Sequence, residues 1–65
     1  MILQHVRLKG YTVVEIAKIM EMPRRTLYDK IKHPIRLSRA ERRKLCRLLG
    51  IKVAELEQHI KETSL

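Results

Sequence analysis

Apolar residues recur along the whole chain at spacings of three and four residues, which is the period of an α-helix rather than of a β-strand. The pattern therefore predicts an all-α fold. The polar breaks between the apolar stretches are only a few residues long, as in a compact bundle of about five short helices. We expect helices over residues 2–9, from 12 to a turn at 21–22, and over 23–32, 38–49 and 52–62.

Two short motifs predict where helices begin. The sequences "TVVE" at 12–15 and "SRAE" at 38–41 are both capping boxes. In a capping box the first hydroxyl accepts a hydrogen bond from the amide of the glutamate, and the glutamate carboxylate accepts one from the amide of the first residue. We therefore expect helices to start at Thr12 and at Ser38.

Glycine and proline predict where helices end. Gly10 and Gly50 each follow an apolar stretch, at the point where a left-handed residue commonly terminates a helix. Pro23 closes the second helix, because the residue before a proline avoids the α region. Pro23 can also open the third helix, because proline fits the first helical position. His33 and Pro34 end that third helix.

The second and third helices each have one apolar side. In the second helix, four residues form a stripe that we expect to be buried, namely Val13, Ile16, Ala17 and Met20. In the third helix Leu27 and Ile31 share one side, so a group of polar residues shares the other. That group consists of Arg24, Arg25, Tyr28, Asp29 and Lys32. The sequence predicts that this polar face meets solvent or a partner.

The net charge of +8 is concentrated in the middle of the chain. Residues 24–47 hold ten basic and two acidic side chains, which accounts for all of it. Such a concentration favours a polyanionic partner, either nucleic acid or an anionic membrane, although a solvated surface is the alternative. The helix at 38–49 is basic and amphipathic but has no aromatic residue, so we expect no membrane partner.

Other kinds of chemistry find no support in the sequence. Cys46, the only cysteine, lies in an apolar stretch, where we expect it to be a small buried filler. His33, Cys46 and His59 are thirteen residues apart, which is not a metal-ligand spacing, so we expect no metal and no cofactor. Without a nucleophile beside a base, a carboxylate pair or a glycine-rich phosphate loop, we expect no enzyme. A single cysteine and the lack of a signal peptide or a bilayer-length apolar run predict a reducing, intracellular setting.

The run "TVVEIAKIMEMPRRTLYDKIKHPIRLSRAERRKLCRLLGIKVAEL" resembles the Cro-type helix-turn-helix domains of phage repressors and related bacterial regulators. The resemblance covers about residues 2–60. The segment "RRTLYDKIK" is also similar to the DNA-binding end of Fis-type regulators, but the two helices after it favour the Cro type. The resemblance implies one lambda-repressor-like domain over residues 1–65, which acts as a transcriptional regulator of phage or mobile-element origin in the bacterial cytoplasm or nucleoid.

The resemblance also implies the partner and the site. The partner would be double-stranded DNA, with helix 23–32 in its major groove. There arginine binds guanine, and Asp29 accepts a hydrogen bond from cytosine. The residues that the resemblance places at DNA are Thr12, Arg24, Arg25, Tyr28 and Asp29. The full set of expected DNA contacts also includes Thr26, Lys32 and Arg36. Family members bind as two-fold dimers, so we expect a homodimer. Its interface would use the last helix, around Val53, Leu56 and Ile60 or whichever of these the core leaves exposed.

Three positions depart from the family pattern. Glu21 stands where the family usually has a glycine in the turn, and a left-handed residue with a β-carbon costs about 1 kcal/mol. Pro23 replaces the usual Ser or Thr, so the third helix loses its side-chain cap. Arg42 occupies a position that is often apolar, which predicts a thinner core there.

A second function remains open from the sequence. The same fold can bind another protein, as an antirepressor or an antitoxin-like partner does, because a fold does not fix a function. Val14 falls nearly opposite the buried stripe of the second helix, and Ile19 falls at its margin. These two residues are expected to leave apolar surface for a partner or for self-association.

Overall fold

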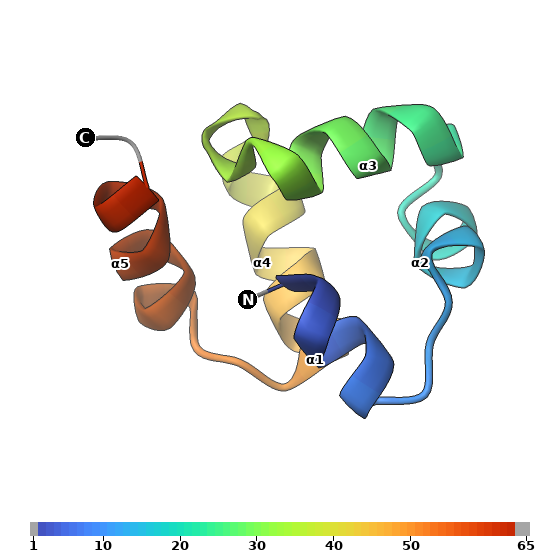
Figure 1. Cartoon of the computed structure of the whole chain (residues 1–65), viewed down its shortest axis with the longest axis horizontal. Helices are drawn as coiled ribbons and strands as arrows, with labels where there is room; N and C mark the ends of the chain where they lie inside the picture. The colour runs from blue at the N-terminus through green and yellow to red at the C-terminus, as the bar shows by residue number, and fades with distance from the viewer. Residues whose placement is uncertain (1, 64–65) are drawn as a thin grey trace.

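The computed structural model describes residues 2–63, over which the chain forms five α-helices and one 3-10 turn and contains no strand (Figure 1). The predicted all-α fold is therefore confirmed. The elements are α1 (Ile2–Leu8), α2 (Val13–Ile19), α3 (Arg24–Lys32), η1 (Pro34–Arg36), α4 (Arg39–Leu49) and α5 (Val53–Thr63). The sequence predicted all five α-helices but did not predict η1.

Both capping boxes are present. The Thr12 amide donates to Glu15 Oε1 at 2.9 Å, and the Glu15 amide donates to Thr12 Oγ1 at 3.2 Å. At the start of α4 the corresponding distances are 2.8 Å from the Ser38 amide to Glu41 Oε1 and 3.2 Å from the Glu41 amide to Ser38 Oγ. The first helical residue follows Thr12 and Ser38 directly, so these motifs fix the starts of α2 and α4.

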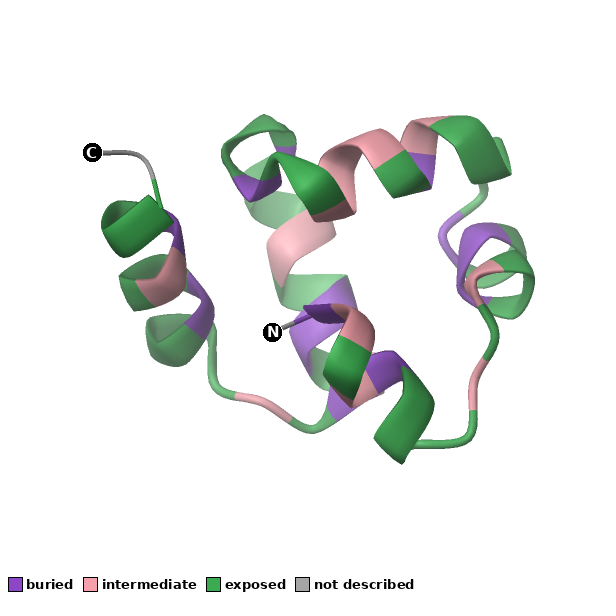
Figure 2. Ribbon diagram, in the orientation of Figure 1, coloured by how far each residue is buried: buried purple, intermediate pink, exposed green. Residues whose placement is uncertain are grey.

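All five α-helices contribute to one hydrophobic core (Figure 2). The buried apolar residues are Ile2 and Val6 of α1, Ile16, Ala17 and Met20 at α2, Leu27 of α3, Leu37 after η1, Leu45, Cys46 and Leu49 of α4, and Leu56 and Ile60 of α5. The stripe predicted on the second helix is thus buried, apart from Val13, which is half-buried. Cys46 is buried as expected, and burial is the main reason that the pKa of its thiol is raised.

Two of the three residues expected at a dimer interface belong instead to this core. Leu56 has no exposed surface and Ile60 is 7% exposed, because α5 packs its apolar stripe against the rest of the bundle. A residue already covered within its own chain cannot also cover a second copy. Of the three, only Val53 at the start of α5 remains exposed.

The helices place α3 at one edge of the molecule. In Figure 1, α3 lies along the top, α2 lies beside its first residues, and α4 starts near its last residues and runs away from it. α1 and α5 lie below α3 in this view. None of the helices between residues 2 and 63 is long and apolar enough to cross a membrane.

Candidate nucleic-acid interface

The turn between α2 and α3 ends α2 in a left-handed residue. Glu21 has a φ of 55°, its amide donates to the Lys18 carbonyl at 3.1 Å, and the Met22 amide donates to the Ala17 carbonyl at 3.0 Å. This pair of hydrogen bonds is the Schellman pattern, which usually places glycine at the left-handed position. Gly10 occupies the equivalent position after α1. The sequence therefore identified the turn correctly, including the residue that would be strained.

α3 begins without help from a capping side chain. Pro23 is the N-cap residue, with a φ of −61° and no side-chain hydrogen bond to the helix, as its replacement of Ser or Thr predicted. Its carbonyl accepts the first helical hydrogen bond, from the Leu27 amide at 3.0 Å. The inward side of α3 carries the buried Leu27 and the half-buried Ile31. The packing of these two residues holds the helix on the core.

The outward side of α3 carries most of the residues expected at DNA. Arg24, Arg25 and Lys32 are exposed, and Tyr28 has 45% of its surface exposed. Thr26 is half-buried, so it lies at the margin of this side. We call the exposed residues Arg24, Arg25, Tyr28 and Lys32 the α3 face. Three of its four members are cations, which makes it chemically suited to a phosphate-rich partner.

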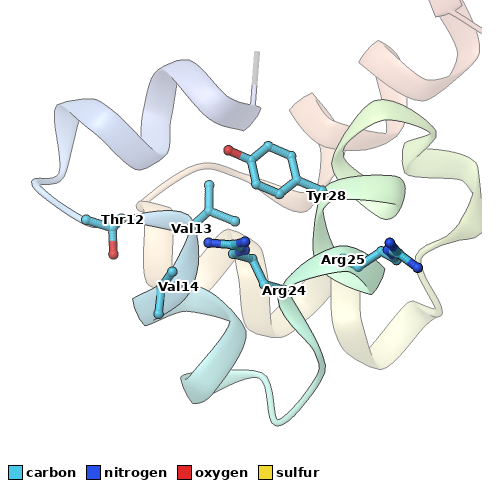
Figure 3. Close-up of a pocket in the computed structure, with 6 residues that line it drawn as sticks. All are labelled: Thr12, Val13, Val14, Arg24, Arg25 and Tyr28. Carbon is cyan, nitrogen blue, oxygen red and sulfur yellow. The ribbon is translucent and has the colours of Figure 1, made fainter.

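Part of the α3 face joins α2 in an open groove of about 810 Å³ (Figure 3). Its lining residues are Thr12, Val13 and Val14 from the start of α2, and Arg24, Arg25 and Tyr28 from α3. In Figure 3 the side chains of Arg24 and Tyr28 extend toward Val13 and Val14, whereas Arg25 points to the other side of α3. The structure thus brings Thr12 beside α3, and it gives the two neighbouring arginines different directions.

An ion pair connects Asp29 with Arg36. Arg36 Nη1 donates to Asp29 Oδ2 at 2.6 Å, and the two side chains are about half exposed, at 58% and 46%. A pair this exposed contributes little to folding stability. Its importance lies in the surface charge, because Arg36 offsets the single acidic side chain of α3. The sequence named both residues as DNA contacts but did not predict that they contact each other.

A second ion pair fixes α3 to α4. Lys30 Nζ lies 2.8 Å from Glu41 Oε1 and 2.7 Å from Oε2, and both side chains are partly buried. The bonds from Lys30, followed by the backbone bond from Ser38, lower the pKa of the Glu41 carboxyl. The sequence predicted only the capping role of Glu41. Lys30 follows the buried Leu27 by three residues and so lies on the inner side of α3. That position was the sequence signal that Lys30 would pair with an acidic side chain.

Arg42 does not simply thin the core. Its Nη2 donates to the Ile35 carbonyl at 3.3 Å, and its Nη1 lies 3.8 Å from Glu57 Oε1. Its Nε is buried and has no hydrogen-bond partner among the residues described. One side chain therefore links α4 both to η1 and to α5. This arrangement holds the loop that carries Arg36 beside the end of α3.

Two further findings concern possible ligands and relatives. Between residues 2 and 63, no three His, Cys, Asp or Glu side chains lie close enough together to hold a metal ion. Comparisons with protein-family models, with curated proteins and with solved structures gave no match for this chain.

Proposed function

We propose that the protein is a non-enzymatic, sequence-specific DNA-binding regulator that inserts α3 into the major groove of double-stranded DNA. The observation that carries the proposal is the α3 face, which places three exposed cations on the outward side of a helix at the edge of the molecule. An α-helix with its side chains is about 10–12 Å in diameter, and the major groove is about 12 Å wide. α3 is therefore the right size to lie in that groove.

Each residue of the site has a role in this proposal. Arg24 and Arg25 have the chemistry to bind guanine O6 and N7 with two hydrogen bonds, and Asp29 can accept one from cytosine N4. The residues that would contact the sugar-phosphate backbone are Thr12, Thr26, Tyr28, Lys32 and Arg36. Because Arg24 points toward α2 and Arg25 points away, the two arginines would read different positions of the site.

We also propose that the regulator is a repressor of the Cro type and binds as a homodimer. A helix of this length contacts few base pairs, and dimers of such proteins read half-sites about 34 Å apart. Because Leu56 and Ile60 are in the core, the interface would have to use exposed residues such as Val53. Sedimentation on a two-half-site duplex tests this point, and a lone monomer on that duplex contradicts it.

The experiment for the main proposal is a gel-shift titration. The probes are duplexes from the DNA that flanks the gene and a shuffled duplex of the same length and composition. The proposal predicts one flanking probe that binds at least tenfold more tightly than its shuffled counterpart at the same salt concentration, because specificity ratios of such proteins are about 10³ or more. Equal affinity for every probe would reject sequence-specific binding.

The exposed apolar residues of α2 favour a second candidate, a protein-binding module. Val14 and Ile19 are 42% and 38% exposed, and Val14 lines the groove beside Arg24 and Tyr28. A protein partner could cover this apolar surface, which DNA phosphates would not do. Replacing Val14 with Ser separates the candidates. A protein-binding module would lose its partner, whereas a DNA-binding protein would keep its specific affinity.

A further inference from the structure

The outward side of α4 carries a second group of cations, separate from the α3 face. Arg43, Lys44 and Arg47 are all exposed, and they lie opposite the buried Leu45 and Leu49. In a helix, residues three and four apart are neighbours on the surface, so Arg43, Lys44 and Arg47 form one patch. We call these three residues the α4 face.

Of the other charged residues of α4, Glu41 and Arg42 are engaged elsewhere, whereas Arg39 is an exposed cation one turn before Arg43. Glu41 pairs with Lys30 on the flank toward α3, and Arg42 contacts Glu57 on the flank toward α5. No residue of the α4 face takes part in an ion pair within residues 2–63. The patch therefore keeps its full charge of +3, with no acid of its own helix on the same side.

Lys9 extends the patch beyond the end of α4. Its Nζ lies over Gly50, where a β-carbon would be 3.1 Å away. Gly50 follows Arg47 by three residues and Arg43 by seven, so the three positions lie in one row along the helix surface. Seven residues span about 10.5 Å along a helix, so this row is long enough to contact more than one phosphate of a DNA strand.

α4 starts near the last residues of α3 and runs away from it, so the last residues of α4 lie away from α3 (Figure 1). Arg47 is in the last turn of α4, and Lys9 Nζ lies over Gly50 directly after that turn. The flank of α4 toward α3 is marked by Glu41, which points in a different direction from Arg43 and Arg47. We therefore expect a straight duplex bound along α3 to leave the last turn of α4 uncovered.

We propose that the α4 face, together with Lys9, binds the sugar-phosphate backbone of a second DNA duplex, so that one protein molecule bridges two DNA segments. The charge of the patch, and its lack of ion pairs in the part of the chain that the structure describes, suit phosphates of any sequence. An anionic membrane surface fits less well, because the α4 face presents no large apolar residue that could enter a bilayer. The bridging depends on the proposed function of α3, but phosphate binding by the α4 face does not.

The test is a bridging assay with two duplexes, one attached to beads and one fluorescent. Wild-type protein should retain the fluorescent duplex on the beads. The double variant Arg43→Gln/Arg47→Gln should lose this retention, and its binding to a single random duplex should have a salt slope less steep by about 1.8, or about 0.9 for each lost phosphate. The matched control Arg7→Gln/Lys61→Gln removes two exposed charges from α1 and α5 and should bridge like wild type. Helical circular dichroism and sedimentation check that both variants keep the fold and the oligomeric state.

The outcomes separate this inference from the proposed function. Arg24→Ala/Arg25→Ala should also abolish bridging, yet it should keep salt-dependent binding to one random duplex through the α4 face. If that variant bridged normally, α3 would not be the first DNA site. Phosphate binding by the α4 face would still be supported by the change in salt slope of Arg43→Gln/Arg47→Gln. Bridging by Arg43→Gln/Arg47→Gln equal to that of its control would overturn the inference. The inference would also be overturned if wild-type protein failed to bridge and instead sedimented with phosphatidylserine vesicles in a way that required Arg43 and Arg47. The patch would then bind lipid.

Discussion

Glu21 shows how one residue can carry strain at a site that the proposed function needs. Its φ of 55° is the only positive value outside glycine in residues 2–63. Replacing Glu21 with Gly should stabilise the protein by about 1 kcal/mol, because glycine adopts this conformation without a β-carbon clash. For a chain of this size that raises the melting temperature by about 4–8 °C.

The control for this prediction is Glu21→Ala. Alanine removes the charge and the long side chain but keeps the β-carbon, so it should give no comparable gain. Thermal unfolding of the three proteins side by side measures both effects. Equal stabilisation by Gly and Ala would mean that the glutamate side chain, and not the backbone, is the source of the strain.

Glu41 makes the folding stability of the protein depend on pH in a predictable way. Lys30 lowers the pKa of the Glu41 carboxyl in the fold below its ordinary value of 4.5, so the unfolded chain takes up the proton first as the pH falls. The stabilisation is therefore fully present above pH 4.5 and is lost as the pH falls through the lower, folded-state pKa. Glu41→Gln keeps a capping side chain but removes the charge, and should cost about 1 kcal/mol at neutral pH.

Denaturant unfolding across pH 3 to 7 checks this prediction. The gap in unfolding free energy between wild type and Glu41→Gln should narrow below pH 4.5. The gap in unfolding free energy between wild type and Lys30→Met should narrow in the same pH window, because that variant lacks the main cause of the lowered pKa. A gap that stays constant across that pH range would show that the ion pair does not stabilise the fold.

The Asp29–Arg36 ion pair is expected to affect how well the protein discriminates between DNA sequences. Asp29→Asn removes the only acid of α3 and releases Arg36 from it. Random DNA should then bind more tightly, because the face gains positive charge, and discrimination between sequences should decrease. Arg36→Gln is the paired variant, which should weaken binding to all sequences. Affinities on the best flanking probe and on its shuffled counterpart measure both effects, and a tighter, more selective Asp29→Asn would contradict the assigned role.

At the scale of the helices, the two capping boxes make a direct prediction. Thr12→Ala and Ser38→Ala each remove a side-chain cap, which should cost about 1 kcal/mol, a large part of the stability of a small protein. Thr12→Ser and Ser38→Thr keep a hydroxyl at the cap and should stay close to wild type. Chemical denaturation of the four variants distinguishes loss of the cap from a general effect of substitution. Unchanged stability in both alanine variants would contradict the stabilising role of the caps.

Most of the helical architecture was predictable because its signals are local. Each capping box, together with Gly10, Gly50 and Pro23, acts within a few residues, so helix boundaries followed from short stretches of sequence. The place of the turn followed from Pro23 in the same way, whereas the strain at Glu21 followed from the resemblance, because the family usually has glycine there. Spacing also identified the outward residues of α3, because helix geometry alone decides which residues share a side.

Contacts between distant residues were not predictable in this way. The Lys30–Glu41 pair joins residues eleven apart, and the contact of Arg42 with Glu57 depends on how α4 and α5 pack. Periodicity showed that Leu56 and Ile60 face something apolar, but it could not distinguish the core of the same chain from a second copy. The tertiary arrangement decided between these two possibilities.

At the scale of the whole molecule, charge and apolar burial are separated in space. The core takes residues from every α-helix, whereas the α3 face and the α4 face hold exposed cations on two different helices. Long-range attraction from the net charge of +8 would bring DNA to the protein regardless of sequence, and α3 would then select the site. The central claim is thus that the α3 face adds sequence preference to this general attraction.

The measurement that tests this claim most directly compares Arg24→Ala and Arg25→Ala with wild type on the best flanking probe and on its shuffled counterpart, over a series of salt concentrations. Arg7→Ala on α1 is the control for loss of one exposed charge. We predict that each α3 variant loses about 1–3 kcal/mol on the specific duplex, relaxes the preference at one base position, and loses much less on the shuffled duplex. Equal losses on both duplexes would mean that α3 contacts only the backbone, and no loss on either would contradict DNA binding by α3.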